Sequence, residues 1–257
     1  MENILQKIYE EENLCSIMGL NKKYIINDIN VFQEFNRAAF EFNSLIEQKS
    51  LNLFPIKIDQ SRTEYIFSSE QILHFLVMTI YYKNKCLEYV PQKIVLESFV
   101  KHIRPIRIYE SRFFMYSETV FEKLYSYWNR IINTIASLFN KHEKKNIFFS
   151  NIKDVIPARF REIESFKFFI NYKDNEYINL NKQRRIFVHQ YYSFSKTVPL
   201  GVLVTEDLNE IRSFYKKITN NVEFLKKAQR EALFGFYYLI QCIVCINDDI
   251  RLQKLKN

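Results

Sequence analysis

The chain contains only three glycines, Gly19, Gly201 and Gly235, among its 257 residues. Strands joined by tight turns need glycine or other turn residues at short, regular spacing, so a β-sandwich or β-barrel is excluded. The phosphate-binding loops of Rossmann and P-loop proteins need several glycines within a few residues, and the three here stand far apart. The sequence therefore favours helices and excludes both kinds of nucleotide-binding loop.

Apolar residues recur at helical spacing along most of the chain. In the clearest pattern, over residues 112–142, intervals of three and four separate Phe121, Leu124, Trp128, Ile131, Ile135 and Leu138. A second long pattern runs over residues 211–246, and we expect the polar residues 219–221 to break or bend it. Stripes of this kind form the core seam of antiparallel helix bundles. The predicted fold class is all-α, an antiparallel helical bundle.

One stretch departs from this pattern. Residues 55–67 are less regular and predict a minor β-hairpin, two short strands around a polar turn. We expect Ser68 or Ser69 to cap the apolar helix that follows. The predicted organisation is an N-terminal helical extension over residues 1–67 and a helical bundle over residues 68–257.

Shorter helices complete the prediction. They are expected over residues 28–48, from Pro91 to a point before Pro105, over residues 157–171 and over residues 182–194. Proline suits the first turn of a helix and is costly in its interior, which is why Pro105 is expected to end one.

Charge and cysteine usage limit the partners and the compartment. Of the net +8, residues 1–100 carry −3 and residues 101–257 carry +11, which predicts an anionic partner such as nucleic acid or, equally well, a lysine-rich solubilising surface. The acidic N-terminus is unlike a signal peptide, and the apolar residues 232–246 are too few to span a membrane. Cys242-x-x-Cys245 indicates buried helical thiols, because no second pair completes a zinc site. We expect a reduced, cytoplasmic protein with no membrane segment, metal or cofactor.

Residues 181–192, NKQRRIFVHQYY, combine three cations with a histidine and a tyrosine pair. The cations are Lys182, Arg184 and Arg185. If Asn179 or Asn181 caps a helix, these cations fall in its first turns, where the helix dipole disfavours positive charge. Cations kept at such a place predict a bound phosphate.

Arginine and histidine together suit the cleavage of RNA without a metal. A 2′-hydroxyl can attack its own adjacent phosphate when a base takes its proton and a cation offsets the charge that develops. His189 can act as base or acid near neutral pH, and Arg184 stays charged and binds phosphate oxygens in a fork. On an ideal helix these two residues differ by about 140°, so Arg184 must reach from the helix start or act with a histidine of a second subunit.

Arg184-x4-His189 resembles the Arg-x4–6-His motif of the HEPN superfamily of α-helical domains, and Tyr191 extends it to the Arg-x4-His-x-Tyr form of toxins paired with nucleotidyltransferases. The resemblance implies a homodimeric, metal-independent endoribonuclease of a toxin–antitoxin or anti-phage defence system. It implies that Arg184 stabilises the phosphate, that His189 is the general acid–base, and that Tyr191 is modified by a nucleotidyltransferase-type antitoxin or lines the site. The partner would be that antitoxin or another cognate regulator. Lys182 and Arg185 would bind RNA nearby. In the family the residue after the motif arginine is often Asn, Asp or His, and here it is Arg185.

Two other interpretations stay open. The chain could be a non-catalytic HEPN-like module that binds RNA or a protein partner through its basic side. It could also be a structural all-α protein whose basic residues only keep it soluble. A binding module would bind RNA with a steep salt dependence and would not cleave it. A structural protein would have no affinity for RNA at physiological salt.

Overall fold

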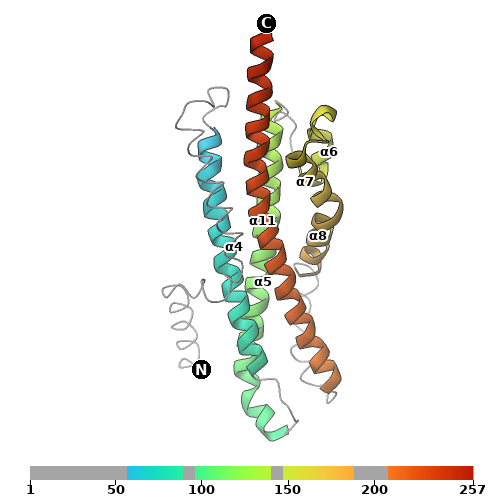
Figure 1. Cartoon of the computed structure of the whole chain (residues 1–257). Coiled ribbons are helices and arrows are strands. Elements are labelled where there is room, and N and C mark those ends of the chain that lie inside the picture. Colours follow the sequence, from blue (N-terminus) through green and yellow to red (C-terminus); the bar gives the residue numbers. More distant parts are fainter. Residues whose placement is uncertain (1–56, 89–95, 140–146, 188–207, 257) are drawn as a thin grey trace. The chain divides into compact units, whose positions relative to one another are not determined.

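The computed structural model describes residues 57–88, 96–139, 147–187 and 208–256, and no strand occurs among them. Three long helices dominate: α4 (Lys57–Glu88), α5 (Leu96–Leu138) and α11 (Leu208–Lys256) (Figure 1). Shorter elements follow α5 in the order η1 (Phe149–Asn151), α6 (Ile152–Val155), η2 (Ala158–Phe160), α7 (Glu164–Tyr172), η3 (Lys173–Tyr177) and α8 (Ile178–Arg185). The predicted all-α class is confirmed for the described residues.

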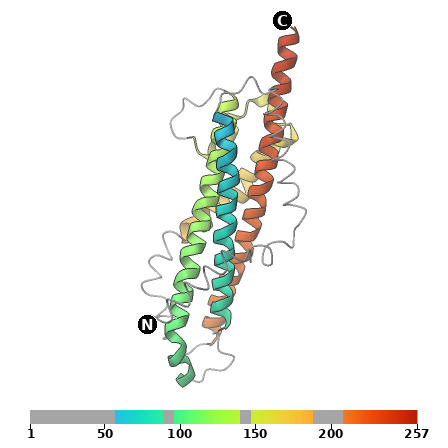
Figure 2. The same ribbon diagram turned by 90° about the vertical axis from the view of Figure 1, so that its left-hand side faces the viewer.

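The chain divides into two compact units. Among the described residues, the first unit comprises residues 71–88, 96–122, 182–187 and 208–228, and the second comprises residues 57–70, 123–139, 147–181 and 229–256. Each of the three long helices contributes one segment to each unit. Within each unit α4 runs antiparallel to α5, and α11 runs in the same direction as α5 (Figures 1 and 2).

The core of the second unit is built around Trp128 of α5, the only tryptophan of the chain, whose side chain is fully buried. Its ring stacks on Tyr172 of α7 with centroids 3.9 Å apart and meets Phe149 of η1 at 5.0 Å. From α11, Gly235 comes so close that a Cβ atom placed on it would lie 2.7 Å from Trp128 Cη2. Only glycine fits at this contact, which lets α11 pack directly against the indole.

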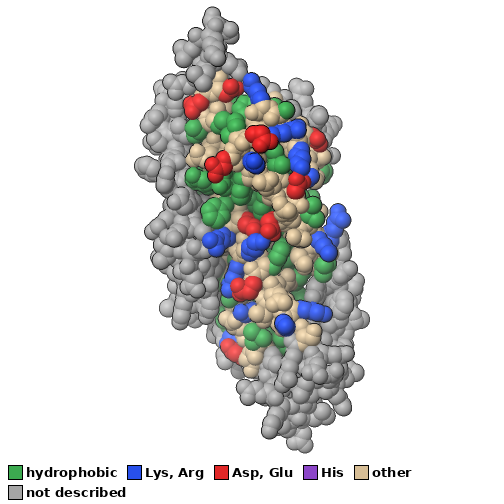
Figure 3. All heavy atoms as spheres, turned by 45° about the vertical axis from the view of Figure 1, so that its right-hand side comes forward, with side chains coloured by type: hydrophobic (Ala, Val, Ile, Leu, Met, Phe, Trp, Pro, Cys, Tyr) green, Lys and Arg blue, Asp and Glu red, His purple; other side chains and the backbone are tan. Residues whose placement is uncertain are grey.

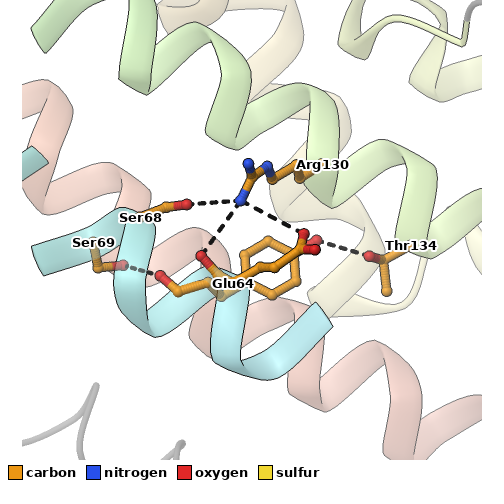
Figure 4. Close-up of polar contacts among 6 residues, drawn as sticks. Glu64, Ser68, Ser69, Arg130 and Thr134 are labelled. Carbon is orange, nitrogen blue, oxygen red and sulfur yellow. Dashed lines mark hydrogen bonds and ion pairs between the residues drawn. The ribbon is translucent and has the colours of Figure 1, made fainter. Parts of the chain in front are cut away.

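Polar side chains join α4 to α5 within the second unit (Figure 4). Arg130 Nη1 donates to Ser68 Oγ at 2.8 Å and lies 3.6 Å from Glu64 Oε2. The hydroxyls of Tyr65 and Thr134 are hydrogen-bonded at 2.7 Å, and the Tyr65 side chain is buried. These contacts set the register of the two helices in addition to the apolar core.

Aromatic rings fill the first unit in the same way. Tyr82 of α4 stacks on Tyr116 of α5 with centroids 5.6 Å apart and ring planes 10° from parallel. Tyr215 of α11 donates from its hydroxyl to Glu110 Oε1 of α5 at 2.9 Å, and both side chains are buried. Burial, followed by the nearby Glu110 charge, raises the pKa of Tyr215 and keeps this tyrosine protonated as the donor.

The predicted β-hairpin at residues 55–67 is wrong where the structure describes it, because α4 begins at Lys57 and is helical throughout. The two serines expected as caps lie inside this helix. Ser69 Oγ donates to the carbonyl of Tyr65 four residues earlier at 2.8 Å, and Ser68 accepts the bond from Arg130. The division of the chain at residue 67 stays a prediction, since most of that extension lies outside the described residues.

The two apolar stripes are confirmed where their side chains are described. All six stripe residues of α5 are buried. The described stripe residues of α11 are also buried: Ile218, Val222, Leu225, Ala232, Phe236, Leu239, Ile243 and Ile246. The break expected as one outcome at residues 219–221 is wrong, because α11 continues through them and Thr219 Oγ1 donates to the Tyr215 carbonyl at 3.0 Å; a bend there stays a prediction. The core contacts on both sides of this polar segment hold it helical.

The shorter predicted helices differ more from the structure. The backbone of α5 continues through Pro105, where we expected a helix to end. Proline has no backbone N–H, so one hydrogen bond is lost within a helix of 43 residues. The helix expected over residues 157–171 is divided into η2 and α7. The helix expected over residues 28–48 lies outside the described residues.

Candidate functional site

The predicted cations lie in the last turn of α8, and not in the first turns of a helix as expected. They are Lys182, Arg184 and Arg185. Helical backbone is continuous from Glu164 to Arg185 through the π-helix η3, so Asn179 and Asn181 lie inside α8 and cap nothing. The helical backbone also continues through Phe187, so the cations do not lie at the N-terminal end of a helix, where unpaired N–H groups would favour an anion. The helix dipole therefore gives no reason to expect a phosphate here.

His189 and Tyr191 lie outside the described residues, as does any part of the expected helix over residues 182–194 beyond Phe187. Their positions relative to Arg184 stay predictions. The described half of the site is the end of α8 and the part of α5 that it contacts.

Arg184 is held by a carboxylate of α5 within the first unit. Its Nε atom donates to Glu122 Oε1 at 2.9 Å, across 62 residues of sequence. The Arg184 side chain is 21% exposed and that of Glu122 is 40% exposed, so water reaches both without fully screening the pair. A partly exposed ion pair of this kind contributes at most about 1 kcal/mol to folding. Its main effect is to orient the guanidinium.

Aromatic packing anchors the same end of α8. Phe187, three residues after Arg184, is buried, and its ring centroid lies 4.9 Å from that of Phe121 and 6.2 Å from that of Phe114. Phe121 directly precedes Glu122 on α5, so the apolar and the ionic contact are neighbours on both helices. Together they hold the backbone next to Arg184 against the core of the first unit.

Lys182 and Arg185 project from α8 as exposed side chains. On the described residues of the face in Figure 3, basic side chains are intermingled with acidic ones. This mixed surface does not by itself define a nucleic-acid interface, and the role of the two exposed cations stays a prediction.

The sequence prediction missed the carboxylates of the site, Glu118 and Glu122. Their spacing of four residues places both on one face of α5, next to the buried Phe121. Burial, and then the charge of Glu122, raises the pKa of Glu118. The signal in the sequence that could have revealed them was the Glu118 and Glu122 pair itself, which lies beside the clearest apolar stripe. Nothing in the sequence links it to an arginine 62 residues further on.

Replacing Glu118 with glutamine is expected to stabilise the protein slightly at pH 7. A raised carboxyl pKa in the folded state means that the ionised form opposes folding, so the opposition grows as the pH rises from below 4.5 through the raised pKa. Like charges one turn apart cost roughly 0.2–0.5 kcal/mol, or about 1 °C in melting temperature. The gain should disappear at pH 4 and should be absent for Glu223→Gln, which removes a carboxylate paired with Lys226. A Glu118→Gln protein that melts below the wild type at pH 7 would contradict this.

Both cysteines of α11 were predicted to be buried, and only one of them is. Cys242 is buried and Cys245 is partly exposed, and burial raises the pKa of both thiols. Among the residues that the structure describes, no group of three or more His, Cys, Asp or Glu side chains is arranged to hold a metal ion. No described helix combines the length and the apolar character needed to cross a membrane.

Fold and site thus define an all-α protein in which α5 holds an arginine of α8. No family model matches this chain, and comparison with curated proteins and with solved structures gave no match either.

Proposed function

We propose that the chain is a metal-independent endoribonuclease of the HEPN type. The observation that carries the proposal is the Arg184-x4-His189-x-Tyr191 sequence in a chain whose described residues are nearly all helical. The fixed, partly exposed Arg184 adds to it, because an arginine oriented before substrate binds is what phosphate stabilisation requires.

In the proposed reaction His189 removes the proton from an RNA 2′-hydroxyl. The oxygen attacks the adjacent phosphorus while Arg184 offsets the charge on the phosphoryl oxygens, and the bond to the 5′-oxygen breaks. A protonated imidazole returns a proton to that leaving oxygen. The products are a 2′,3′-cyclic phosphate and a 5′-hydroxyl. Lys182 and Arg185, exposed on the same turn of α8, would bind flanking phosphates.

The proposed biological setting follows from the same resemblance. We expect a homodimer in which two Arg184–His189 segments meet, acting on RNA in the cytoplasm within a toxin–antitoxin or defence system. A nucleotidyltransferase-type antitoxin would control it by modifying Tyr191, or another cognate regulator would control it.

A second candidate function is a non-catalytic HEPN-like module that binds RNA or a protein. The contact between Arg184 and Glu122 favours it, because the carboxylate already offsets the guanidinium charge. Arg185, in the place where the family often has Asn, Asp or His, also favours it.

A single assay separates the two functions. We expect the purified full-length chain to cut RNA in excess EDTA, while the cognate DNA oligonucleotide stays intact. A binding module would leave the RNA uncut and bind it with an affinity that falls steeply with salt. RNA that stays intact over a wide range of substrates and enzyme concentrations would contradict the endoribonuclease proposal.

A further inference from the structure

The contact between α5 and α8 assigns a role to a residue that the sequence motif does not include. Glu122 lies on α5 and Arg184 on α8, and the bond between Oε1 and Nε is 2.9 Å long. Both residues belong to the first unit, so the contact lies within one compact body.

The bond uses the Nε–H group, the donor nearest the aliphatic part of the arginine. Because Nε is bonded to the chain carbon, fixing its N–H direction also fixes the plane of the guanidinium. The buried Phe187 holds the backbone three residues further on against Phe121, and this limits movement of the arginine stem. The plane of Arg184 is therefore set by α5 before any substrate arrives.

The carboxylate of Glu122 also opposes phosphate binding. It brings negative charge to the side from which α5 contacts Arg184. Because Glu122 would repel an anionic substrate, its contact with Arg184 is better explained by orienting the arginine than by attracting RNA.

We propose that Glu122 is a positioning residue, which orients the Arg184 guanidinium toward the scissile phosphate. This inference rests on the proposed function. An arginine freed from this contact would still bind phosphate but would reach the transition-state geometry less often. The loss should therefore appear in kcat and not as a rise in KM, because the carboxylate that repels the substrate is also removed.

The test compares Glu122→Ala with Glu122→Gln in an RNA cleavage assay. We expect the alanine variant to lose about 10- to 100-fold in kcat, and the glutamine variant, whose amide oxygen can accept the same bond, to stay close to the wild type. Glu223→Ala, which removes a carboxylate paired with Lys226 of α11, should cleave as the wild type does. If Glu122→Ala does not fold, Glu122→Asp serves instead, since withdrawing the carboxylate by one methylene should also lower kcat.

Other outcomes overturn the inference in distinguishable ways. Wild-type kcat in Glu122→Ala or Glu122→Asp rules out positioning, and faster cleavage by both the alanine and the glutamine variant makes the carboxylate an inhibitor of Arg184. A lowered melting temperature with unchanged kcat makes the contact purely structural. If Arg184→Ala cuts RNA at the wild-type rate, the proposed function fails as well. If Arg184→Ala loses cleavage and Glu122→Ala does not, only the inference about Glu122 fails.

Discussion

Alanine in place of His189 or Arg184 is expected to abolish RNA cleavage almost completely. Loss of a general acid–base typically costs about 10²–10⁴-fold, and loss of a group that stabilises transition-state charge about 10²–10³-fold. Because the two groups act in one step, the double variant should cleave RNA only a little more slowly than the slower of the two single variants. The rates are measured on one RNA under single-turnover conditions, with helical content checked by circular dichroism.

Matched substitutions elsewhere show whether the loss is specific. His74→Ala removes a histidine beside Phe75 on α4, and Arg159→Ala removes an exposed arginine paired with Asp249. Both should cleave as the wild type does. Lys182→Ala should weaken RNA binding and reduce its salt dependence while kcat stays unchanged. Wild-type rates in both His189→Ala and Arg184→Ala would remove the assignment.

The largest effect on stability is expected for Trp128→Ala, about 3–5 kcal/mol in the free energy of unfolding. The indole is fully buried, stacks on Tyr172 and lies against Gly235, so its removal leaves a cavity bordered by α7 and α11. Urea unfolding followed by circular dichroism measures the change, because this substitution removes the only tryptophan and its fluorescence.

Phe148→Ala is the matched control for this cavity. Phe148 is also a large aromatic residue of the second unit, but it is 45% exposed. Its removal should change the unfolding free energy by no more than about 0.5 kcal/mol. Equal urea midpoints for Trp128→Ala and the wild type would show that Trp128 does not support the core.

The sequence predicted the long helices because their apolar residues repeat at helical spacing over many turns. The stripes on α5 and α11 needed only local information, and each described stripe residue is buried. Residues 57–67 were misassigned because the contacts that favour helix there come from α5: Thr134 bonds to Tyr65, and Arg130 forms an ion pair with Glu64. Such distant partners leave no mark on local spacing.

The site was predictable only as a set of residue types. The order Arg, His and Tyr is readable in the sequence, whereas the position of the cations relative to the two ends of the helix dipole depends on where the helix begins. A π-helix joins α8 to α7, and this continuity moved the cations from the expected first turn to the last. The pairing of Arg184 with Glu122 is a tertiary contact between helices far apart in sequence, so local patterns could not reveal it.

The chemical ends of the RNA products test the central claim most directly. We propose that Arg184 and His189 drive attack by the 2′-hydroxyl, so the wild-type chain in excess EDTA should leave 2′,3′-cyclic phosphate and 5′-hydroxyl ends. Those ends should be missing when His189→Ala is assayed in parallel. Products with 3′-hydroxyl and 5′-phosphate ends, formed only when Mg²⁺ is added and equally by His189→Ala, would contradict the account.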